Sequence, residues 1–491
     1  MYSFFDAFTL HALIYSCIGA VLGIIWGAMP GLSMTMGMAL LAQFSYSMNV
    51  YDSTAFLMGV YTGATFGGAI SAILINIPGT PDAVPTQLAG YPLTKQGRGG
   101  EALGMAIAAS FIGNWVGILL LMAFTPVALA FAMHFGAWEQ FLLALWGILI
   151  AGSLSGESDS ALKGWISGWI GLAIAMVGIE PIIGHQRMTF DIPELLGGIQ
   201  FIPALIGLFG LAEVLRVATE PEVQREPGPL GRVIPHLRDF TRYIRSALRS
   251  SALGTIIGVI PGGGGPMATF LAYDWGQKAS GKDFSKGSVE GVVCSETANN
   301  ACIGGSLLPA MSLGIPGTAA AAVFMAALAF QGLVVGPTID QSQPGFMQFL
   351  YGTLIVANLA MYIFGFALIK PSLYALTVRR GILMPLVTVL CVVGAFSLHL
   401  SSFDVMVMLV FGVIGYVLRQ WEFPLAPMVF AMILGNMADE NFRKAMIIFS
   451  SDGILSAMLR PIGIVMLAII AWTLYSGIKA SFGEKPKAGE E

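Results

Sequence analysis

The sequence predicts an all-α polytopic membrane protein with two inverted structural repeats and helices that are broken or re-entrant at Pro-Gly motifs. Of its 491 residues, 56% are hydrophobic and only 11% are charged. A soluble domain carries about 25% charged residues, so this chain lacks the polar side chains to cover a soluble surface. Apolar runs such as Phe141–Ser153 and Leu350–Ile369 do not alternate as strands do, which favours membrane helices over an outer-membrane barrel.

An ordered set of motifs occurs twice, once in each half of the chain. Gly27-Ala-Met-Pro30 is matched by Gly258-Val-Ile-Pro261, and Ile77-Pro-Gly-Thr80 is matched by Ile315-Pro-Gly-Thr318. Further along, Asn114 is matched by Asn358. The distance between matched motifs grows only slowly, as small loop insertions would make it. Such an ordered series indicates an internal duplication.

A polar segment near the middle divides the chain. We predict an N-terminal transmembrane repeat at 1–215, a basic cytoplasmic linker at 216–250, a C-terminal transmembrane repeat at 251–478 and a polar cytoplasmic tail at 479–491. Lys and Arg collect in cytoplasmic loops. The loop with Lys95 and Arg98 corresponds to Gly336–Gly345, which has no basic residue, and other basic loops have equally bare partners. This pattern predicts that the two repeats are inverted.

The Pro-Gly motifs predict helix breaks, because proline removes a backbone donor and glycine adds backbone freedom. Within a bilayer, such backbone survives only where protein or water satisfies its polar groups. A helix that restarts after a break presents free N–H groups at a positive dipole end, which can bind a carboxylate. We therefore expect the breaks to converge on one site near mid-membrane. The predicted substrate-binding residues are Pro30, Gly31, Ser33, Thr35, Pro78, Gly79, Thr80, Gly262, Gly263, Gly264, Gly265, Pro316, Gly317 and Thr318.

Oxygen-bearing residues near the breaks predict a cation site beside the carboxylate. A charged side chain at depth costs roughly 2.5–3.5 kcal/mol, so Glu296 needs a role such as ion binding. Exposed carbonyl groups on the other side of each break suit Na⁺. The predicted cation-binding residues are Asn76, Glu296, Thr297, Asn299 and Asn300.

Structural interpretations stay open beside these functional ones. Ser33 and Thr80 can be helix caps, and the glycine pairs Gly67-Gly68 and Gly304-Gly305 can be helix-packing surfaces. Glu296 can lie at a loop end near Lys286, and Asp82, which follows Pro81, can lie at the end of a span.

Several classes of function leave no trace in the sequence. Gly262–Gly265 is followed by no Gly-Lys-Ser/Thr, so it is not a phosphate-binding loop, and nothing suggests ATP hydrolysis. There is no catalytic constellation, no histidine or cysteine spacing typical of a metal site, no sign of a cofactor and no nucleic-acid-binding pattern. We expect a membrane transporter and not an enzyme.

Four motifs in order resemble the signature of the tripartite tricarboxylate transporter large subunit, TctA. They are Gly27-Ala-Met-Pro-Gly-Leu-Ser33, Asn76-Ile-Pro-Gly-Thr-Pro-Asp82, Gly258-Val-Ile-Pro-Gly-Gly-Gly264 and Gly314-Ile-Pro-Gly-Thr318. The resemblance covers roughly Phe8 to Gly477. It implies a multi-pass protein of the bacterial inner (plasma) membrane that takes up carboxylates such as citrate, coupled to Na⁺ or H⁺. It also implies two partners, a small TctB-like transmembrane subunit and a periplasmic TctC-like solute-binding protein.

Two alternatives remain at this stage. One is an organic-anion channel, in which the same helix ends would line a continuous pore. The other is a secondary anion transporter that works without a binding protein. Substrate flux against its gradient, driven by an ion gradient, would exclude the channel.

Overall fold

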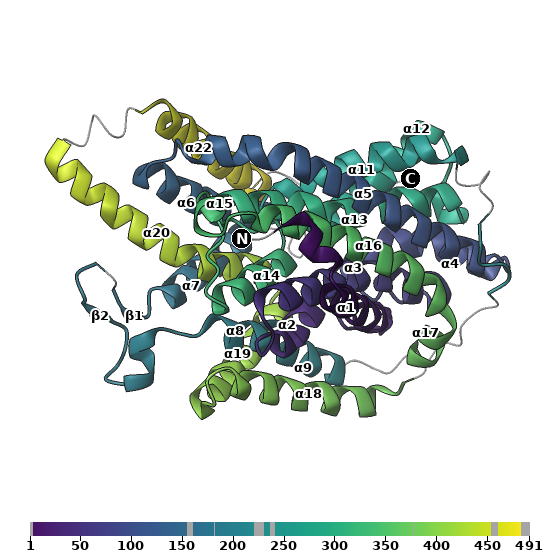
Figure 1. Cartoon of the computed structure of the whole chain (residues 1–491), viewed down its shortest axis with the longest axis horizontal. Coiled ribbons are helices and arrows are strands. Elements are labelled where there is room, and N and C mark those ends of the chain that lie inside the picture. The colour runs from purple at the N-terminus through teal and green to yellow at the C-terminus, as the bar shows by residue number, and fades with distance from the viewer. Residues whose placement is uncertain are drawn as a thin grey trace. The chain divides into compact units, whose positions relative to one another are not determined.

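The computed structural model describes residues 3–154, 161–180, 182–219, 230–235, 241–376, 378–452 and 460–482. These residues are almost entirely helical, with one pair of two-residue strands (Figure 1). In the part of the chain that is described, nine helices are long and apolar enough to cross a membrane. The predicted all-α polytopic membrane class is therefore confirmed.

The chain forms two compact units, one comprising Met1–Ala132 and Ile202–Tyr416, the other Met133–Phe201 and Val417–Glu491. Each unit draws residues from both halves of the sequence. The two units therefore do not coincide with the two predicted repeats. The repeats themselves stay a prediction.

The first unit holds all of the predicted breaks. Its elements are η1 (Phe4–Phe8), α1 (Leu10–Ala28), α2 (Met34–Ser45), α3 (Val50–Ile75), η2 (Pro81–Ala83), α4 (Val84–Lys95), α5 (Gly99–Ala132), α8 (Phe201–Leu205), η4 (Ile206–Leu211), α9 (Ala212–Thr219), α11 (Ile244–Val259), α12 (Gly264–Ser280), η5 (Phe284–Lys286), α13 (Val289–Leu313), α14 (Ala319–Phe330), α15 (Ile339–Ser342), α16 (Phe346–Ala367), α17 (Ile369–Leu376), α18 (Arg380–Ser397) and α19 (Ser402–Gln420). Helices α8 and α19 include the boundaries with the second unit.

The second unit is smaller. It contains α6 (Ala137–Leu154), α7 (Ala161–Ala175), β1 (Gly178–Ile179), β2 (Gln186–Arg187), η3 (Pro193–Gly197), α20 (Leu425–Asp452) and α22 (Pro461–Phe482). Helix α20 packs on α6 and α7, and α22 packs on α6. Arg187 Nη2 donates to Asp439 Oδ2 at 2.9 Å, and Arg443 pairs with the same carboxylate.

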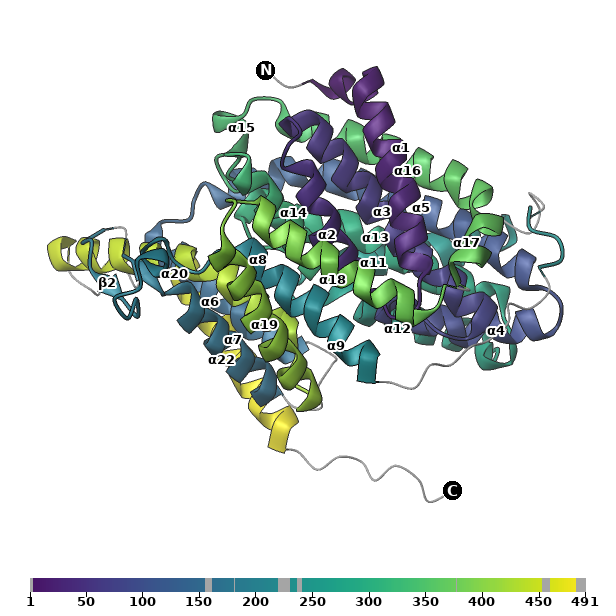
Figure 2. The ribbon, with the colours of Figure 1, turned by 90° about the horizontal axis from the view of Figure 1, so that it is seen from below.

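Helices α3 and α13 are buried along almost their whole length and form the centre of the first unit. Helix α1 lies along α3 (Figure 2). Gly19, Gly23 and Gly27 of α1 face α3 so closely that a Cβ on any of them would overlap the carbonyl oxygen of Phe56, Val60 or Ala64. Such spacing of small residues lets two membrane helices approach backbone to backbone.

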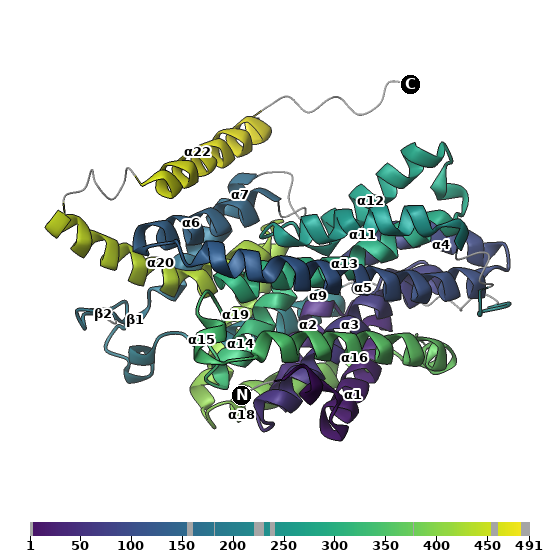
Figure 3. The same ribbon diagram turned by 45° about the horizontal axis from the view of Figure 1, so that its top comes forward.

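Helix α13 packs in a similar way on α11 and α5 (Figure 3). A Cβ on Gly254 of α11 would meet Ala298, and one on Gly113 of α5 would meet Thr297. These glycines let the polar helix α13 lie in the interior, because at these positions its neighbours have no side chain to hold it away.

Matched positions make matched contacts in the two sequence halves. The Gly79 N–H donates to the Gly68 carbonyl at 3.4 Å, and the Gly317 N–H donates to the Ser306 carbonyl at 3.3 Å. Helix α1 packs on α3 as α11 packs on α13, and α16 packs on α3 as α5 packs on α13. These parallels support the predicted duplication. Its inverted orientation stays a prediction.

Some predicted segments lie partly outside the described residues. Within the linker at 216–250, α9 extends to Thr219 and α11 begins at Ile244, so both ends of that segment are helical. Arg225 and Arg238 of the linker lie outside the described residues, as do residues 483–491 of the tail.

Candidate functional site

Every predicted break lies between two helices, as the Pro-Gly motifs require. Helix α1 ends at Ala28 and α2 begins at Met34, while α11 ends at Val259 and α12 begins at Gly264. Helix α3 ends at Ile75 and is followed by Asn76, whose φ is 57°, while α13 ends at Leu313 and is followed by Gly314, whose φ is 73°. Helices α2, α4 and α14, which follow breaks, are each 12 residues long, too short to span a bilayer.

Within each sequence half, the two breaks touch. A Cβ on Gly79 would overlap the carbonyl oxygen of Gly27, and a Cβ on Gly317 would overlap that of Gly258. The Gly262 N–H also donates to the Gly317 carbonyl at 3.2 Å. The end of the first helix in each half therefore packs against the Pro-Gly-Thr motif that follows the third.

Side chains also join the breaks of one half to helices of the other. The Tyr61 hydroxyl, on α3, lies 2.8 Å from Thr318 Oγ1 and 3.0 Å from Ser306 Oγ. The Asp82 carboxylate lies against the start of α12, where a Cβ on Gly265 would be 2.6 Å from Asp82 Cγ.

The two Pro-Gly-Thr motifs are close to each other. Thr80 packs on Gly68 and Thr318 bonds to Tyr61, and both contacts are made by α3. Gly68 and Tyr61 are two turns apart on this helix, which is roughly 10 Å. The structure thus brings the two motifs into one region of the first unit.

The hydroxyl groups predicted to bind substrate have different surroundings. Ser33 Oγ accepts from the Met36 N–H at 3.1 Å and caps α2, while Thr318 Oγ1 accepts from the Ala321 N–H at 3.1 Å and caps α14. Thr35 lies in the first turn of α2 and is half-buried, with Pro30 just before that helix. Thr80 Oγ1 is buried with no hydrogen-bond partner among the described residues.

The glycines of the third break, which lies between α11 and α12, are required by the conformation and packing of the backbone there. Gly262 and Gly264 have φ values of 80° and 58°, in the left-handed region that favours glycine. A Cβ on Gly263 would lie 2.7 Å from the Ile257 carbonyl oxygen. A larger residue at Gly263 would therefore disturb the fold, so this position is a poor test of whether an anion approaches the backbone.

Glu296 is fully buried in the middle of α13 and is bonded only to hydroxyl donors and its own helix. Thr86 Oγ1 donates to Glu296 Oε1 at 2.6 Å, and Ser110 Oγ donates to Oε2 at 2.9 Å. No ion pair joins Glu296 to a Lys or Arg in the described part of the chain. A buried carboxylate without a cationic partner is a functional candidate in a membrane protein.

An asparagine chain continues from Glu296. Asn300 Nδ2 donates to the Glu296 carbonyl at 3.1 Å, and Asn114 Nδ2 lies 3.3 Å from Asn300 Oδ1 and 3.1 Å from Asn358 Oδ1. Asn299 Nδ2 donates to the Thr65 carbonyl at 3.4 Å. Glu296, Asn299 and Asn300 share one face of α13, because residues three and four apart lie on the same side of a helix.

The other two predicted cation ligands are engaged elsewhere. Thr297 Oγ1 donates to the Val293 carbonyl at 2.7 Å, within its own helix. Asn76 is held by Gln87, whose Nε2 donates to the Asn76 side-chain oxygen at 2.9 Å and to its carbonyl at 3.0 Å.

Sequence reasoning did not assign several residues that the structure places here. Tyr61, Thr86, Ser110 and Gln87 lie inside helices, and no local motif marks them. Asp82 was interpreted as a possible span end because it follows Pro81, but it is only 6% exposed. A carboxylate beside a helix break in apolar sequence was the signal that could have identified it.

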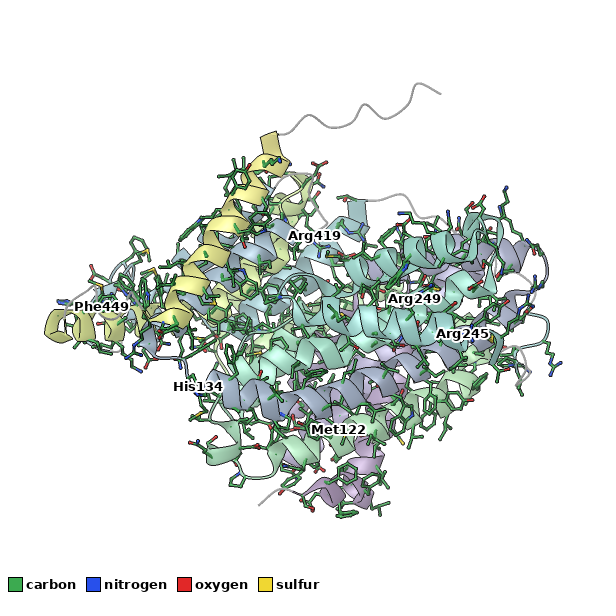
Figure 4. The ribbon with its side chains drawn as sticks, turned by 90° about the horizontal axis from the view of Figure 1, so that it is seen from above. Met122, His134, Arg245, Arg249, Arg419 and Phe449 are labelled. Atoms are coloured by element: carbon green, nitrogen blue, oxygen red, sulfur yellow. The ribbon has the colours of Figure 1, made fainter. Side chains whose placement is uncertain are left out.

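A basic side chain lies on the helix that leads to the third break. Arg249 projects from α11, one turn beyond Arg245 (Figure 4), and its guanidinium lies 5.1 Å from the centre of the Trp275 ring. Arg249 belongs to none of the breaks, and none of the four break motifs contains an arginine.

Comparisons with known proteins agree with the motifs. The chain matches the family described as "Tripartite tricarboxylate transporter TctA family" over residues 13–430. It is 34% identical over 471 residues to the "Uncharacterized 52.8 kDa protein in TAR-I ttuC' 3'region" of Agrobacterium vitis, covering 95% of this chain and 93% of that protein. It is 33% identical over 201 residues to the "Uncharacterized protein in TAR-II ttuC' 3'region" of the same organism, covering 40% of this chain and 83% of that protein. No solved structure matches the chain.

Proposed function

Because the chain belongs to the tripartite tricarboxylate transporter TctA family, we propose that it takes up tri- or dicarboxylates by cation-coupled secondary transport. The family is one of transporters, and the chain is a multi-pass protein of the inner membrane. In this proposal a periplasmic solute-binding protein delivers the carboxylate, and a small transmembrane subunit completes the assembly.

The observation that carries the proposal is the grouping of the helix breaks in the first unit. Helices α2, α12 and α14 each begin at a break, with N–H groups free at a positive dipole end. Such ends bind anions without a full cationic charge, and discontinuous helices form the binding sites of many secondary transporters. The Ser33 hydroxyl, which accepts one hydrogen bond as a cap, keeps a proton to donate to a carboxylate.

Cation coupling is supported by the buried carboxylates near the breaks. A di- or tricarboxylate brings negative charge into a low-dielectric interior that already contains Glu296 and Asp82. A co-transported cation would offset that charge, because opposite charges attract strongly where water is scarce. The same cation would supply the free energy for accumulation.

Uptake into proteoliposomes tests the proposal. The full chain would be reconstituted with its small subunit, and radiolabelled citrate would be added with the binding protein. We expect accumulation above equilibrium with an inward Na⁺ or proton gradient and only equilibration without one. Equal uptake with and without the gradients would contradict coupling and favour a channel. Full uptake without the binding protein would favour a transporter that needs no such partner.

Alternating access by two inverted repeats is the mechanism we propose. It requires the linker and the loop at Gln341 to lie on opposite sides of the membrane, because these segments are separated by an odd number of crossings in the inverted arrangement. Accessibility of single cysteines at Arg238 and Gln341 to an impermeant reagent tests this. Labelling of both positions from the same side would contradict the inversion.

A further inference from the structure

The first Pro-Gly-Thr break contains a buried hydroxyl without a hydrogen bond. Thr80 is 2% exposed, and its Oγ1 has no partner among the described residues. The corresponding hydroxyl of Thr318 is bonded to Tyr61 and to a backbone N–H. A buried hydroxyl without a partner costs free energy, so this group is a candidate contact for a ligand.

Two residues further on, the Asp82 side chain is also without a partner. No hydrogen bond or ion pair joins its carboxylate to any residue that the structure describes. It packs against Gly265 at the start of α12. A buried carboxylate is costly unless it is paired, hydrogen-bonded or bound to a cation.

The neighbours of Asp82 supply no positive charge. Glu296, Cys302 and Tyr61 lie close enough to interact electrostatically with Asp82, and none of these side chains can be positively charged. Glu296 adds a second carboxylate to the same region. The site therefore attracts a cation from outside the chain.

A bound cation satisfies this arrangement better than a proton. A proton on Asp82 would neutralise the carboxylate but would leave the Thr80 hydroxyl without a partner. A Na⁺ ion accepts oxygen ligands from a carboxylate and a hydroxyl together. Helix α3 ends at Ile75, five residues before Thr80 and seven before Asp82, and adds the negative end of a helix dipole. Among the described residues, no group of three or more His, Cys, Asp or Glu side chains could hold a metal ion, which disfavours a tightly bound divalent ion.

We propose that Asp82 and Thr80 bind the coupling cation, Na⁺, in the first Pro-Gly-Thr break, with Glu296 as a neighbouring charge that is already held by Thr86 and Ser110. This inference rests on the proposed cation coupling and names the residues that perform it. The second Pro-Gly-Thr motif has no equivalent site, because its hydroxyl is bonded and Ala320 stands in the position of Asp82.

Thermal unfolding of the purified full chain in detergent tests the site directly. NaCl would be titrated against choline chloride at constant ionic strength. We expect the unfolding temperature of the wild type to rise and saturate with Na⁺. Asp82→Asn should raise the Na⁺ concentration for half the effect at least tenfold, and Thr80→Val should raise it severalfold, while Thr80→Ser should stay near the wild type.

Two control variants separate the site from general damage. Asp274→Asn removes an exposed carboxylate that pairs with Lys278, and it should leave the Na⁺ response unchanged. Thr318→Val should lower the unfolding temperature without Na⁺ but keep the response to Na⁺. If Asp82→Asn does not fold, the pair Thr80→Val and Thr80→Ser decides, because only the former loses the hydroxyl.

The possible outcomes are distinct. An unchanged Na⁺ response in both Asp82→Asn and Thr80→Val would overturn the site. So would a wild type that responds to low pH and not to Na⁺, with Asp82→Asn removing that response, because Asp82 would then bind a proton. Na⁺-driven uptake by Asp82→Asn at wild-type Na⁺ dependence would overturn the site and leave the proposed function intact. Na⁺ binding at Asp82 without any coupled uptake would support the site and contradict the proposed function.

Discussion

The segments Ile77–Thr80 and Ile315–Thr318 have the same four residues, and each follows a long buried helix. In the second segment, Thr318 caps α14 and bonds to Tyr61, and Gly317 is bonded through both its N–H and its carbonyl. In the first segment, Thr80 has no side-chain partner among the described residues and is followed by a buried carboxylate. Identical local sequence thus gives one motif that is fully bonded and one that has groups left for a ligand.

The residues that follow each motif give a physical reason for the difference. Pro85 has no N–H, so the carbonyl of Pro81 accepts from Val84 instead, in the tighter 3₁₀ turn η2. In that turn the Ala83 N–H bonds to the Thr80 carbonyl at 3.0 Å. In the second half Val323 stands in the position of Pro85, and α14 begins as an α-helix with its cap in place.

The largest loss of stability is expected at the glycine that packs in the same way in both motifs. Gly79→Ala and Gly317→Ala each place a Cβ against the carbonyl oxygen of Gly27 or Gly258, so each should cost about 3 kcal/mol, the upper end of the usual range for overpacking. Thermal unfolding measures it. The control is Gly381→Ala, because nothing lies within 4 Å of a Cβ there. Sensitivity at only one of the two motifs would show that their packing is not equivalent.

A smaller loss of stability is expected from Tyr61→Phe, which removes hydrogen bonds made to the second motif and not to the first. The change removes a hydroxyl that bonds to Thr318 and Ser306, and it should destabilise the chain by about 2 kcal/mol. Chemical or thermal unfolding would detect this. Tyr475→Phe, at a tyrosine that is 60% exposed, should change nothing. Equal stability of the two variants would mean that the Tyr61 hydroxyl contributes little.

Replacing the threonine by valine should change the stability of the chain differently in the two motifs. Without Na⁺, Thr318→Val should cost about 1 kcal/mol, because a helix cap and a bond to Tyr61 are lost. Thr80→Val removes a hydroxyl that has no partner, so in the same buffer it should be neutral or stabilising. Unfolding temperatures of the two variants in choline buffer give the comparison, and an equal loss would contradict it.

The smallest effect is expected from Pro85→Ala, which should change stability by less than about 0.5 kcal/mol. The new N–H can bond to the Pro81 carbonyl and let the turn become α-helical, while the unfolded chain gains flexibility. The informative measurement is the double variant. In the Pro85→Ala background, Thr80→Val should become destabilising by about 1 kcal/mol, because Thr80 could then cap the helix. If Thr80→Val stays neutral there, Pro85 is not the cause of the asymmetry.

The sequence by itself determined the membrane class and the positions of the breaks. Both depend on local properties: a chain with so few charges must be buried in lipid, and a Pro-Gly pair in an apolar run ends a helix wherever it occurs. The burial of Glu296 in the middle of α13 disagrees with the alternative that it lies at a loop end, and its role in ion binding stays a prediction.

Only the tertiary structure decided which polar groups are left without partners. Thr80 and Thr318 look alike in sequence, and the difference between them depends on Tyr61 of α3, which bonds to one and not to the other. Asp82 looks like a residue at a span end until its burial against Gly265 is known. Hydrogen bonds between residues far apart in the chain carry no local signal, because they depend on how helices pack and not on the residues beside them.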